Sequence, residues 1–173
     1  MDNVATHEDW KSCFSEFSPG LLLFARQWVR SSADAEDIVQ EAFVKFWRRN
    51  HKIDPPSPGS GVAGSRGLLY AIVRSTALDF IRRDSRRARR EVIAFSEEEK
   101  SVEPHFEFED ETQCALASAM DRLPHDQREV LVLKIWNELT FAEIASAVGI
   151  SQNTAASRYR YALAGLKKSL QPQ

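Results

Sequence analysis

The stretch that decides the fold runs from Leu139 to Leu170 and reads LTFAEIASAVGISQNTAASRYRYALAGLKKSL. It predicts two helices joined by a tight turn. Thr140 and Glu143 have the spacing of a capping box, in which each side chain satisfies a backbone N–H at the start of the helix. Gly149 stands where a left-handed residue can end the first helix without a Cβ clash. Ser151 is a good N-cap for the second helix.

The second helix of this stretch has two unlike faces. Small, aliphatic and aromatic residues share one side: Ala155, Tyr159, Ala162, Leu163, Leu166 and Leu170. The other side is polar, short at first and cationic further along: Asn153, Ala156, Ser157, Arg160, Tyr161 and Lys168. Short polar side chains can reach base edges in a major groove, whereas Arg and Lys bind phosphate. The stretch therefore predicts a DNA-binding helix-turn-helix; the alternative is an ordinary helical hairpin with a solvated polar face.

Composition indicates an ordinary globular chain. Its 173 residues are 43% hydrophobic and 28% charged, which allows one domain or two small ones. No apolar run is long enough to span a bilayer, and the first residues lack the pattern of a signal peptide. Cys13 and Cys114 lie far apart, and the four histidines have no metal-ligand spacing. We therefore expect a cytoplasmic protein with no membrane insertion, no metal and no cofactor.

The net charge of −2 hides a strong local asymmetry. Residues 82–90, RRDSRRARR, hold six arginines, and residues 91–111, EVIAFSEEEKSVEPHFEFEDE, hold nine acids against one lysine. The acidic stretch has little helical periodicity, so it is typical of a flexible, solvated linker. A flexible linker would leave the parts on either side without a fixed spacing.

The rest of the chain is predicted to be all-α, because strict alternation of apolar and polar residues persists nowhere. The clearest periodicity lies in residues 33–49, where apolar residues recur at i, i+4 and i+8. Residues 50–66 contain three prolines and three glycines, so a loop is expected there. The other expected helices cover residues 7–17, 20–30, 67–83, 112–122 and 126–137.

Three segments together resemble one known family. DAEDIVQEAFVKFWRR (34–49) resembles the polymerase-binding helix of bacterial sigma factors, and STALDFIRR (75–83) resembles their promoter-melting helix. Residues 123–163 resemble their fourth-region helix-turn-helix. Order and spacing are similar to those of the extracytoplasmic-function (ECF) type of the sigma-70 family. The resemblance implies an all-α fold of two small helical domains, a region 2 bundle over 1–87 and a region 4 helix-turn-helix over 112–173, joined by an acidic linker over 88–111.

The resemblance also implies roles for individual residues. A polymerase-binding face would consist of Asp37, Gln40 and Glu41. Minus-ten binding and melting would use Arg74, Ser75, Arg82 and Arg83, beside the loop at 50–66. The upstream element would be bound by Thr140, Gln152, Asn153, Ala156, Ser157, Arg158 and Arg160. The partners implied are core RNA polymerase, through its β′ clamp helices and β flap, promoter DNA and an anti-sigma factor.

Two alternatives stand beside this interpretation. A two-domain helix-turn-helix regulator could act without joining polymerase, although it would leave the DAEDIVQEAF helix unexplained. An enzyme acting on nucleic acid or nucleotides is disfavoured, because no phosphate-binding loop, metal-ligating motif or Ser/His/Asp setting is visible. The sequence predicts no catalytic residue. It also departs from many relatives at Leu68 and Ser75, where they carry Trp and Asn.

Overall fold

The computed structural model describes residues 5–50, 62–92 and 111–170, and within these ranges the chain forms seven α-helices and no strand. The helices are α1 (Ala5–Ala25), α2 (Ser32–Asn50), α3 (Val62–Val92), α4 (Glu111–Asp121), α5 (His125–Ile135), α6 (Phe141–Val148) and α7 (Gln152–Leu170). The predicted all-α fold is confirmed. We call α1–α3 the first half of the chain and α4–α7 the second half.

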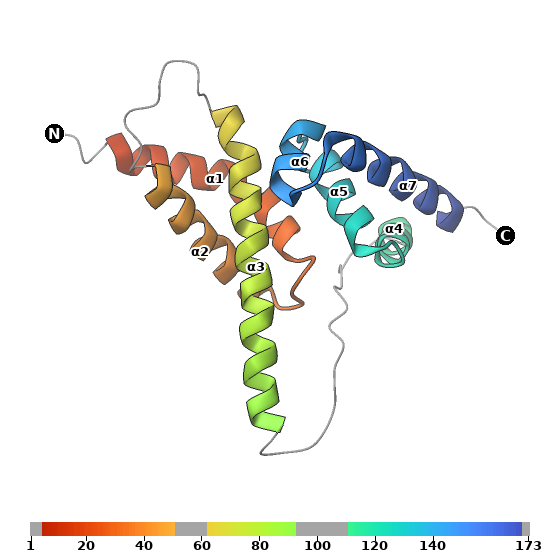
Figure 1. Cartoon of the computed structure of the whole chain (residues 1–173), viewed down its shortest axis with the longest axis horizontal. Helices are drawn as coiled ribbons and strands as arrows, with labels where there is room; N and C mark the ends of the chain where they lie inside the picture. The colour runs from red at the N-terminus through yellow and green to blue at the C-terminus, as the bar shows by residue number, and fades with distance from the viewer. Residues whose placement is uncertain (1–4, 51–61, 93–110, 171–173) are drawn as a thin grey trace.

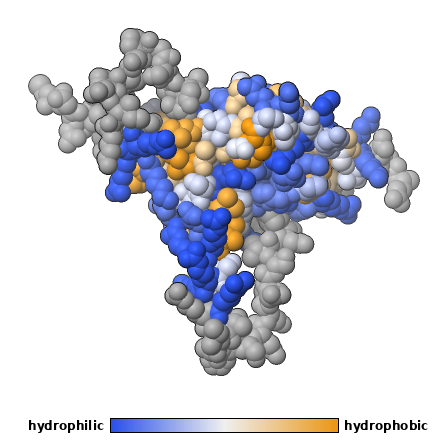
Figure 2. Space-filling view, in the orientation of Figure 1, coloured by the Kyte–Doolittle hydropathy of each residue, from blue (hydrophilic) through white to orange (hydrophobic). Residues whose placement is uncertain are grey.

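The long helix α3 lies between α2 and the second half, and α1 crosses behind it so that its C-terminal end emerges beside α5 (Figure 1). Its N-terminal part packs on α2, α1 and α6, while its C-terminal end extends beyond both groups of helices (Figure 1). Residues 82–89 on this free end are exposed. The face of the free end that Figure 2 shows is largely hydrophilic.

Helix α1 differs from the sequence-based expectation. The separate helices predicted over 7–17 and 20–30 are wrong, because one helix runs from Ala5 to Ala25 with Pro19 inside it. Buried residues lie on both sides of the proline, including Phe17, Leu21 and Phe24. Their burial favours a continuous helix although a proline inside a helix removes one backbone hydrogen bond. The chain then leaves the helix after Ala25, so the predicted helical end at 26–30 is absent.

Helix α2 matches its prediction closely. Ser31 precedes it as N-cap: the Ser31 hydroxyl accepts from the Asp34 N–H at 3.4 Å and the Ser31 carbonyl from the Ala35 N–H at 3.1 Å. The apolar side chains at the expected helical spacing are buried: Ile38, Val39, Ala42, Phe43 and Phe46. Local periodicity and capping therefore sufficed to place this helix.

Helix α3 is longer than the residues 67–83 predicted for it. It begins at Val62, so the last part of the loop predicted over 50–66 is helical, and it continues through the arginine-rich run to Val92. Residues 88–92 of the predicted linker therefore belong to α3, and Glu111 begins α4. Arginine is a good helix former, which explains why the run can extend α3. The remaining linker residues 93–110, like loop residues 51–61, lie outside the described residues.

The two halves pack directly against each other and share one hydrophobic core. Buried residues from the first half, such as Phe24 and Tyr70, belong to the same cluster as Leu133, Leu139 and Ile144 of the second half. Helix α6 packs on α3, and α5 packs on α1. The structure thus differs from the expectation of two parts without fixed spacing, because apolar surface on each half is buried against the other.

Candidate nucleic-acid interface

The α6–α7 pair has the predicted helix-turn-helix geometry. The capping box is present: the Thr140 hydroxyl accepts from the Glu143 N–H at 3.2 Å, and the Glu143 carboxylate accepts from the Thr140 N–H at 2.7 Å. Gly149 is left-handed with φ of 77°, and its N–H donates to the Ala145 carbonyl at 2.9 Å. The Ser151 hydroxyl caps α7 by accepting from the Thr154 N–H at 3.1 Å. Local hydrogen bonds therefore define the turn and the start of α7.

The residues predicted to read DNA bases lie at the start of α7 with different exposures. Gln152 and Asn153 are exposed, whereas Ala156 and Ser157 are half-buried. Arg160 is exposed one turn further along, and its guanidinium donates to the Ser157 hydroxyl at 3.3 Å. The first turn thus presents amide side chains, and the next turns present a hydroxyl and a cation. Amide and hydroxyl side chains can contact base edges, and a cation can contact phosphate.

Two residues predicted at this interface also have structural partners. Thr140 caps α6, as described above. The Arg158 guanidinium is half-buried and pairs with the Asp126 carboxylate of α5 at 3.1 Å, so it ties α7 to α5. This ion pair is not evident from local sequence patterns, since its partners lie 32 positions apart along the chain. Any phosphate contact of Arg158 would have to compete with Asp126.

The buried face of α7 is narrower than its sequence predicted. Ala155, Ala162 and Leu166 are buried, whereas Leu163 and Leu170 are 40% and 45% exposed. Helix α7 packs on α4, α5 and α6, and these contacts cover only the central stripe of its apolar side.

The predicted polymerase-binding face lies on the exposed side of α2. Asp37 and Gln40 are exposed, and Glu41 is half-buried. The Glu41 carboxylate accepts from the Lys45 ammonium at 2.7 Å and pairs with the Arg83 guanidinium of α3 at 3.4 Å. The hydrogen bond from Lys45 lowers the pKa of Glu41, and the charges of Lys45 and Arg83 lower it further, against the opposing effect of burial. Glu41 therefore stays ionised and joins the predicted polymerase-binding face to the predicted melting helix.

The residues predicted to melt the promoter lie on α3 in two different environments. Ser75, Arg82 and Arg83 are exposed. Arg82 is 3.5 Å from the Asp79 carboxylate of its own helix. Arg74 instead points toward the second half, where its Nε donates to the Glu129 Oε1 of α5 at 2.7 Å. Arg83 thus contacts α2 through Glu41, whereas Arg74 is directed toward α5 with 31% of its side chain still exposed.

Glu129 of α5 is a carboxylate in a buried position. Its side chain is 1% exposed, and the residues that follow it in the helix are apolar, so a charged group is unexpected there. Burial raises the pKa of Glu129, while the charge of Arg74 and the hydrogen bond from it lower that pKa in part. A carboxylate beside the apolar run VLVL was visible in the sequence, but its partner was not.

Metal-ligand clusters and membrane-spanning helices are both absent from the described ranges. No group of three or more His, Cys, Asp or Glu side chains in residues 5–50, 62–92 and 111–170 could hold a metal ion. None of the helices described is long and apolar enough to cross a membrane.

Family models match most of the chain. Sigma-70 region 2 matches residues 13–87, and Sigma-70 region 4 matches residues 115–166. The ECF RNA polymerase sigma factor SigL of Mycobacterium tuberculosis is 28% identical over 93% of this chain and 88% of its own length. The ECF RNA polymerase sigma factor EcfG of Rhodopseudomonas palustris is 31% identical over 88% of this chain and 80% of its own length.

Solved structures share the fold. The sigma factor RpoE of Bartonella quintana, solved in complex with the anti-sigma factor NepR, matches with a TM-score of 0.68 and 23% identity over 94% of this chain and 97% of that one. CnrH, solved in complex with the cytosolic domain of CnrY, matches with a TM-score of 0.61 over 95% and 88% of the two chains. The matched regions, the relatives and the helix-turn-helix agree: the chain belongs to the sigma-70 family of RNA polymerase sigma factors, and within it to the ECF type.

Proposed function

We propose that this chain acts in transcription initiation by binding core RNA polymerase and directing it to specific promoters. The exposed face of α2, with Asp37, Gln40 and Glu41, would dock on the clamp helices of the polymerase β′ subunit. The first turns of α7, with Gln152 and Asn153, would read the upstream promoter element. The exposed residues of α3, Ser75, Arg82 and Arg83, would hold the minus-ten element as it opens.

One observation carries this proposal: a single chain presents exposed amide side chains at the start of the second helix of a helix-turn-helix, and an exposed acidic and amide face on another helix. Gln152 and Asn153 are exposed on α7, and Asp37 and Gln40 are exposed on α2. A regulator that acts without polymerase needs only the first surface. A sigma factor needs both, because it must hold polymerase and promoter at the same time.

The chemistry of α3 suits an opened promoter strand. Unpaired strands are bound by cationic grooves that follow the backbone and by groups that contact splayed bases. Arg82 and Arg83 supply exposed cations one helical turn beyond Asp79, and the Ser75 hydroxyl lies two turns before them. Such a surface stabilises an opened duplex by binding and needs no catalytic group.

Further partners follow from the family. The second half would contact the β flap of polymerase while α7 lies on DNA. The matched RpoE structure is a complex with an anti-sigma factor, and we propose that an anti-sigma factor also controls this chain. Family members are generally DNA-binding initiation factors without catalysis of their own, and we propose the same here. Since polymerase and promoters are cytoplasmic in bacteria, the chain would act there.

The test is transcription in vitro with purified core polymerase on a promoter library. The expected result is core-dependent transcripts whose start sites share a minus-ten and an upstream motif. The control is core polymerase alone, which should yield no transcripts from these promoters. A pull-down with core polymerase separates the rival function, because a regulator that acts alone would bind the promoters without being retained by polymerase.

A further inference from the structure

The polar residues at the start of α7 differ in how their side chains are used. The Ser151 hydroxyl accepts from the Thr154 N–H at 3.1 Å and lies 2.8 Å from the Thr154 hydroxyl, so both hydroxyls are engaged in the cap. Gln152 and Asn153, between them, are exposed. Neither of their side chains has a hydrogen-bond partner among the residues that the structure describes. Two side-chain amides are therefore left for an external partner.

The chemistry of an amide selects among the bases of the major groove. A side-chain amide carries a donor and an acceptor side by side. Adenine presents the matching pair there, the N7 acceptor and the N6 amino donor, so Asn or Gln can bond to it with both groups at once. Guanine presents two acceptors, N7 and O6, and an amide can satisfy only one of them. The exposed amides of α7 therefore match A·T pairs better than G·C pairs.

The groups that read guanine are absent from the first turn of α7. Bidentate reading of guanine needs two donors, which Arg or Lys supplies. No Arg or Lys precedes Arg158 in this helix, and the Arg158 guanidinium is held by the Asp126 carboxylate of α5 at 3.1 Å. Arg160 is exposed, but it lies seven residues beyond Asn153, which is about 10 Å along the helix axis. The cations of α7 are thus unavailable where the amides lie.

Ala156 supports the same base pair. It follows Gln152 by four residues, so the two side chains are neighbours on the helix surface. Ala156 is half-buried and ends in a single methyl group. Thymine carries its own methyl group in the major groove, and alanine is one of the side chains that make apolar contact with it. Gln152 and Ala156 together therefore match both bases of one A·T pair.

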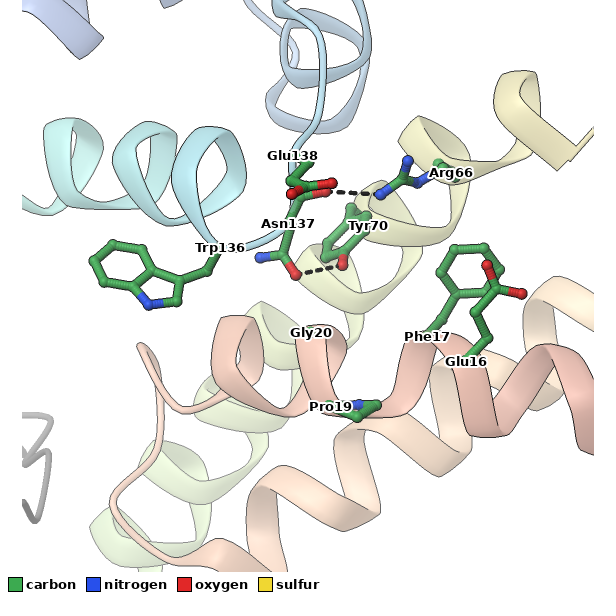
Figure 3. Close-up of a pocket in the computed structure, with 9 residues that line it drawn as sticks. All are labelled: Glu16, Phe17, Pro19, Gly20, Arg66, Tyr70, Trp136, Asn137 and Glu138. Atoms are coloured by element: carbon green, nitrogen blue, oxygen red, sulfur yellow. Dashed lines mark hydrogen bonds between the residues drawn. The ribbon is translucent and has the colours of Figure 1, made fainter.

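The first half leaves this surface uncovered, because it packs on other parts of the second half. Helix α3 packs on α6, and α1 packs on α5. In the turn between α5 and α6, the Arg66 Nη2 donates to the Asn137 carbonyl at 2.7 Å, and the Tyr70 hydroxyl donates to the Asn137 Oδ1 at 2.6 Å (Figure 3). The amide of Asn137 is thus used within the chain, whereas those of Gln152 and Asn153 are not.

We propose that Gln152 and Asn153 each read the adenine of an A·T pair, and that Ala156 contacts the thymine methyl of the pair read by Gln152. Each amide oxygen accepts from the adenine N6 amino group, and each amide N–H donates to N7. The inference rests on the proposed function, because it names the bases that α7 reads in the upstream element. Exchange of either A·T pair for G·C weakens binding by about five- to hundredfold.

The first test is selection from a promoter library by core polymerase with the parent or a variant. The parent should select two A·T pairs in the upstream motif. Gln152→Arg supplies two donors, so it should change one of these pairs to G·C and keep the other. Asn153→Ala should lose the preference at the other pair. Arg160→Ala is the matched control, because it removes a polar side chain from the same helix and should keep both preferences.

The second test removes single groups from the DNA at the pair that Gln152→Arg redirects. Anisotropy with labelled upstream duplexes and the assembled polymerase measures the affinity. Replacing that adenine by 7-deazaadenine, which lacks the N7 acceptor, should weaken binding by the parent about two- to tenfold and leave binding by Gln152→Ala unchanged. Replacing its thymine by uracil, which lacks the methyl group, should weaken binding by the parent about threefold.

Several results would overturn the inference. A parental motif with G·C at both positions would contradict adenine reading, as would an equal effect of 7-deazaadenine on the parent and on Gln152→Ala. Equal binding of the thymine and uracil duplexes would remove the Ala156 contact. Failure of the parent to yield core-dependent transcripts would contradict the proposed function instead. Selection of duplexes by the polymerase-free chain would then still test whether Gln152 and Asn153 read adenine.

Discussion

Removing the hydroxyl of Thr140 should lower the stability of the second half and its affinity for DNA. Helix α6 has only eight residues, and four of them, Ile144, Ala145, Ala147 and Val148, are buried. Its start depends on the capping box with Glu143. Thr140→Ala leaves the Glu143 N–H without its acceptor at 3.2 Å and removes the hydroxyl that donates to the Glu143 Oε2 at 2.9 Å.

The magnitude follows from the bonds that are lost and kept. Replacing a capping Thr by Ala costs about 0.5–2 kcal/mol, typically about 1 kcal/mol. Because the Glu143 carboxylate still accepts from the Thr140 N–H at 2.7 Å, the other half of the box remains. The hydrogen bond between the Glu143 N–H and the Thr140 hydroxyl is exposed, so water can hydrate the freed Glu143 N–H, and the loss should lie near 1 kcal/mol. For a chain of this size that corresponds to a fall in Tm of roughly 2–4 °C.

Urea unfolding followed by circular dichroism measures this cost. Thr140→Ser is the matched control, because it keeps the hydroxyl and should stay within a few tenths of a kcal/mol of the parent. Binding of an upstream-element duplex should weaken for Thr140→Ala and stay near the parental value for Thr140→Ser. If Thr140→Ala unfolds at the same urea concentration as Thr140→Ser, the capping argument is refuted.

Three further outcomes are expected. Arg160→Ala should weaken upstream-duplex binding about equally for all sequences, whereas Gln152→Ala should change preference at particular bases by about 1–3 kcal/mol; identical selected motifs for Gln152→Ala and the parent would refute base reading. Asp37→Arg should cost about 2–5 kcal/mol in polymerase binding without unfolding the chain, and undiminished retention on core polymerase would remove Asp37 from the docking face. Burial raises the pKa of Glu129 above its usual 4.5, so the contribution of this carboxyl to stability is fully present below that pH and is lost as the pH rises through the raised pKa. Glu129→Gln should therefore gain stability relative to the parent from acid toward neutral pH, and parallel urea midpoints across a pH series would contradict this.

Much of the candidate site could be predicted because its signals are local. The capping box of Thr140 and Glu143, the left-handed Gly149 and the cap at Ser151 each involve residues within a few positions of one another. The amphipathic spacing of α2 is similarly short-range. Such features depend on backbone conformation over one or two turns, so they can be recognised without knowing what packs on them.

Element lengths were less predictable where local signals opposed burial. Pro19 indicated a break, yet α1 continues through it because apolar residues on both sides are buried together. Glycines before residue 67 indicated a loop, yet α3 begins at Val62. In α1 the energy of packing outweighs a local preference of a few kcal/mol.

The sequence by itself determined the helical fold, the helix-turn-helix with its caps, and the exposed face of α2, because these depend on neighbours a few residues apart. Only the tertiary structure decided that the two halves pack on each other, with Arg66 bonded to Asn137 and Arg74 paired with Glu129. The partners in that contact are 55 to 71 residues apart along the chain. Their contact depends on how α1, α3, α5 and α6 pack together. It also depends on Gly20 and Gly67, because a Cβ on Gly20 would collide with Asn137 and one on Gly67 would crowd Glu143.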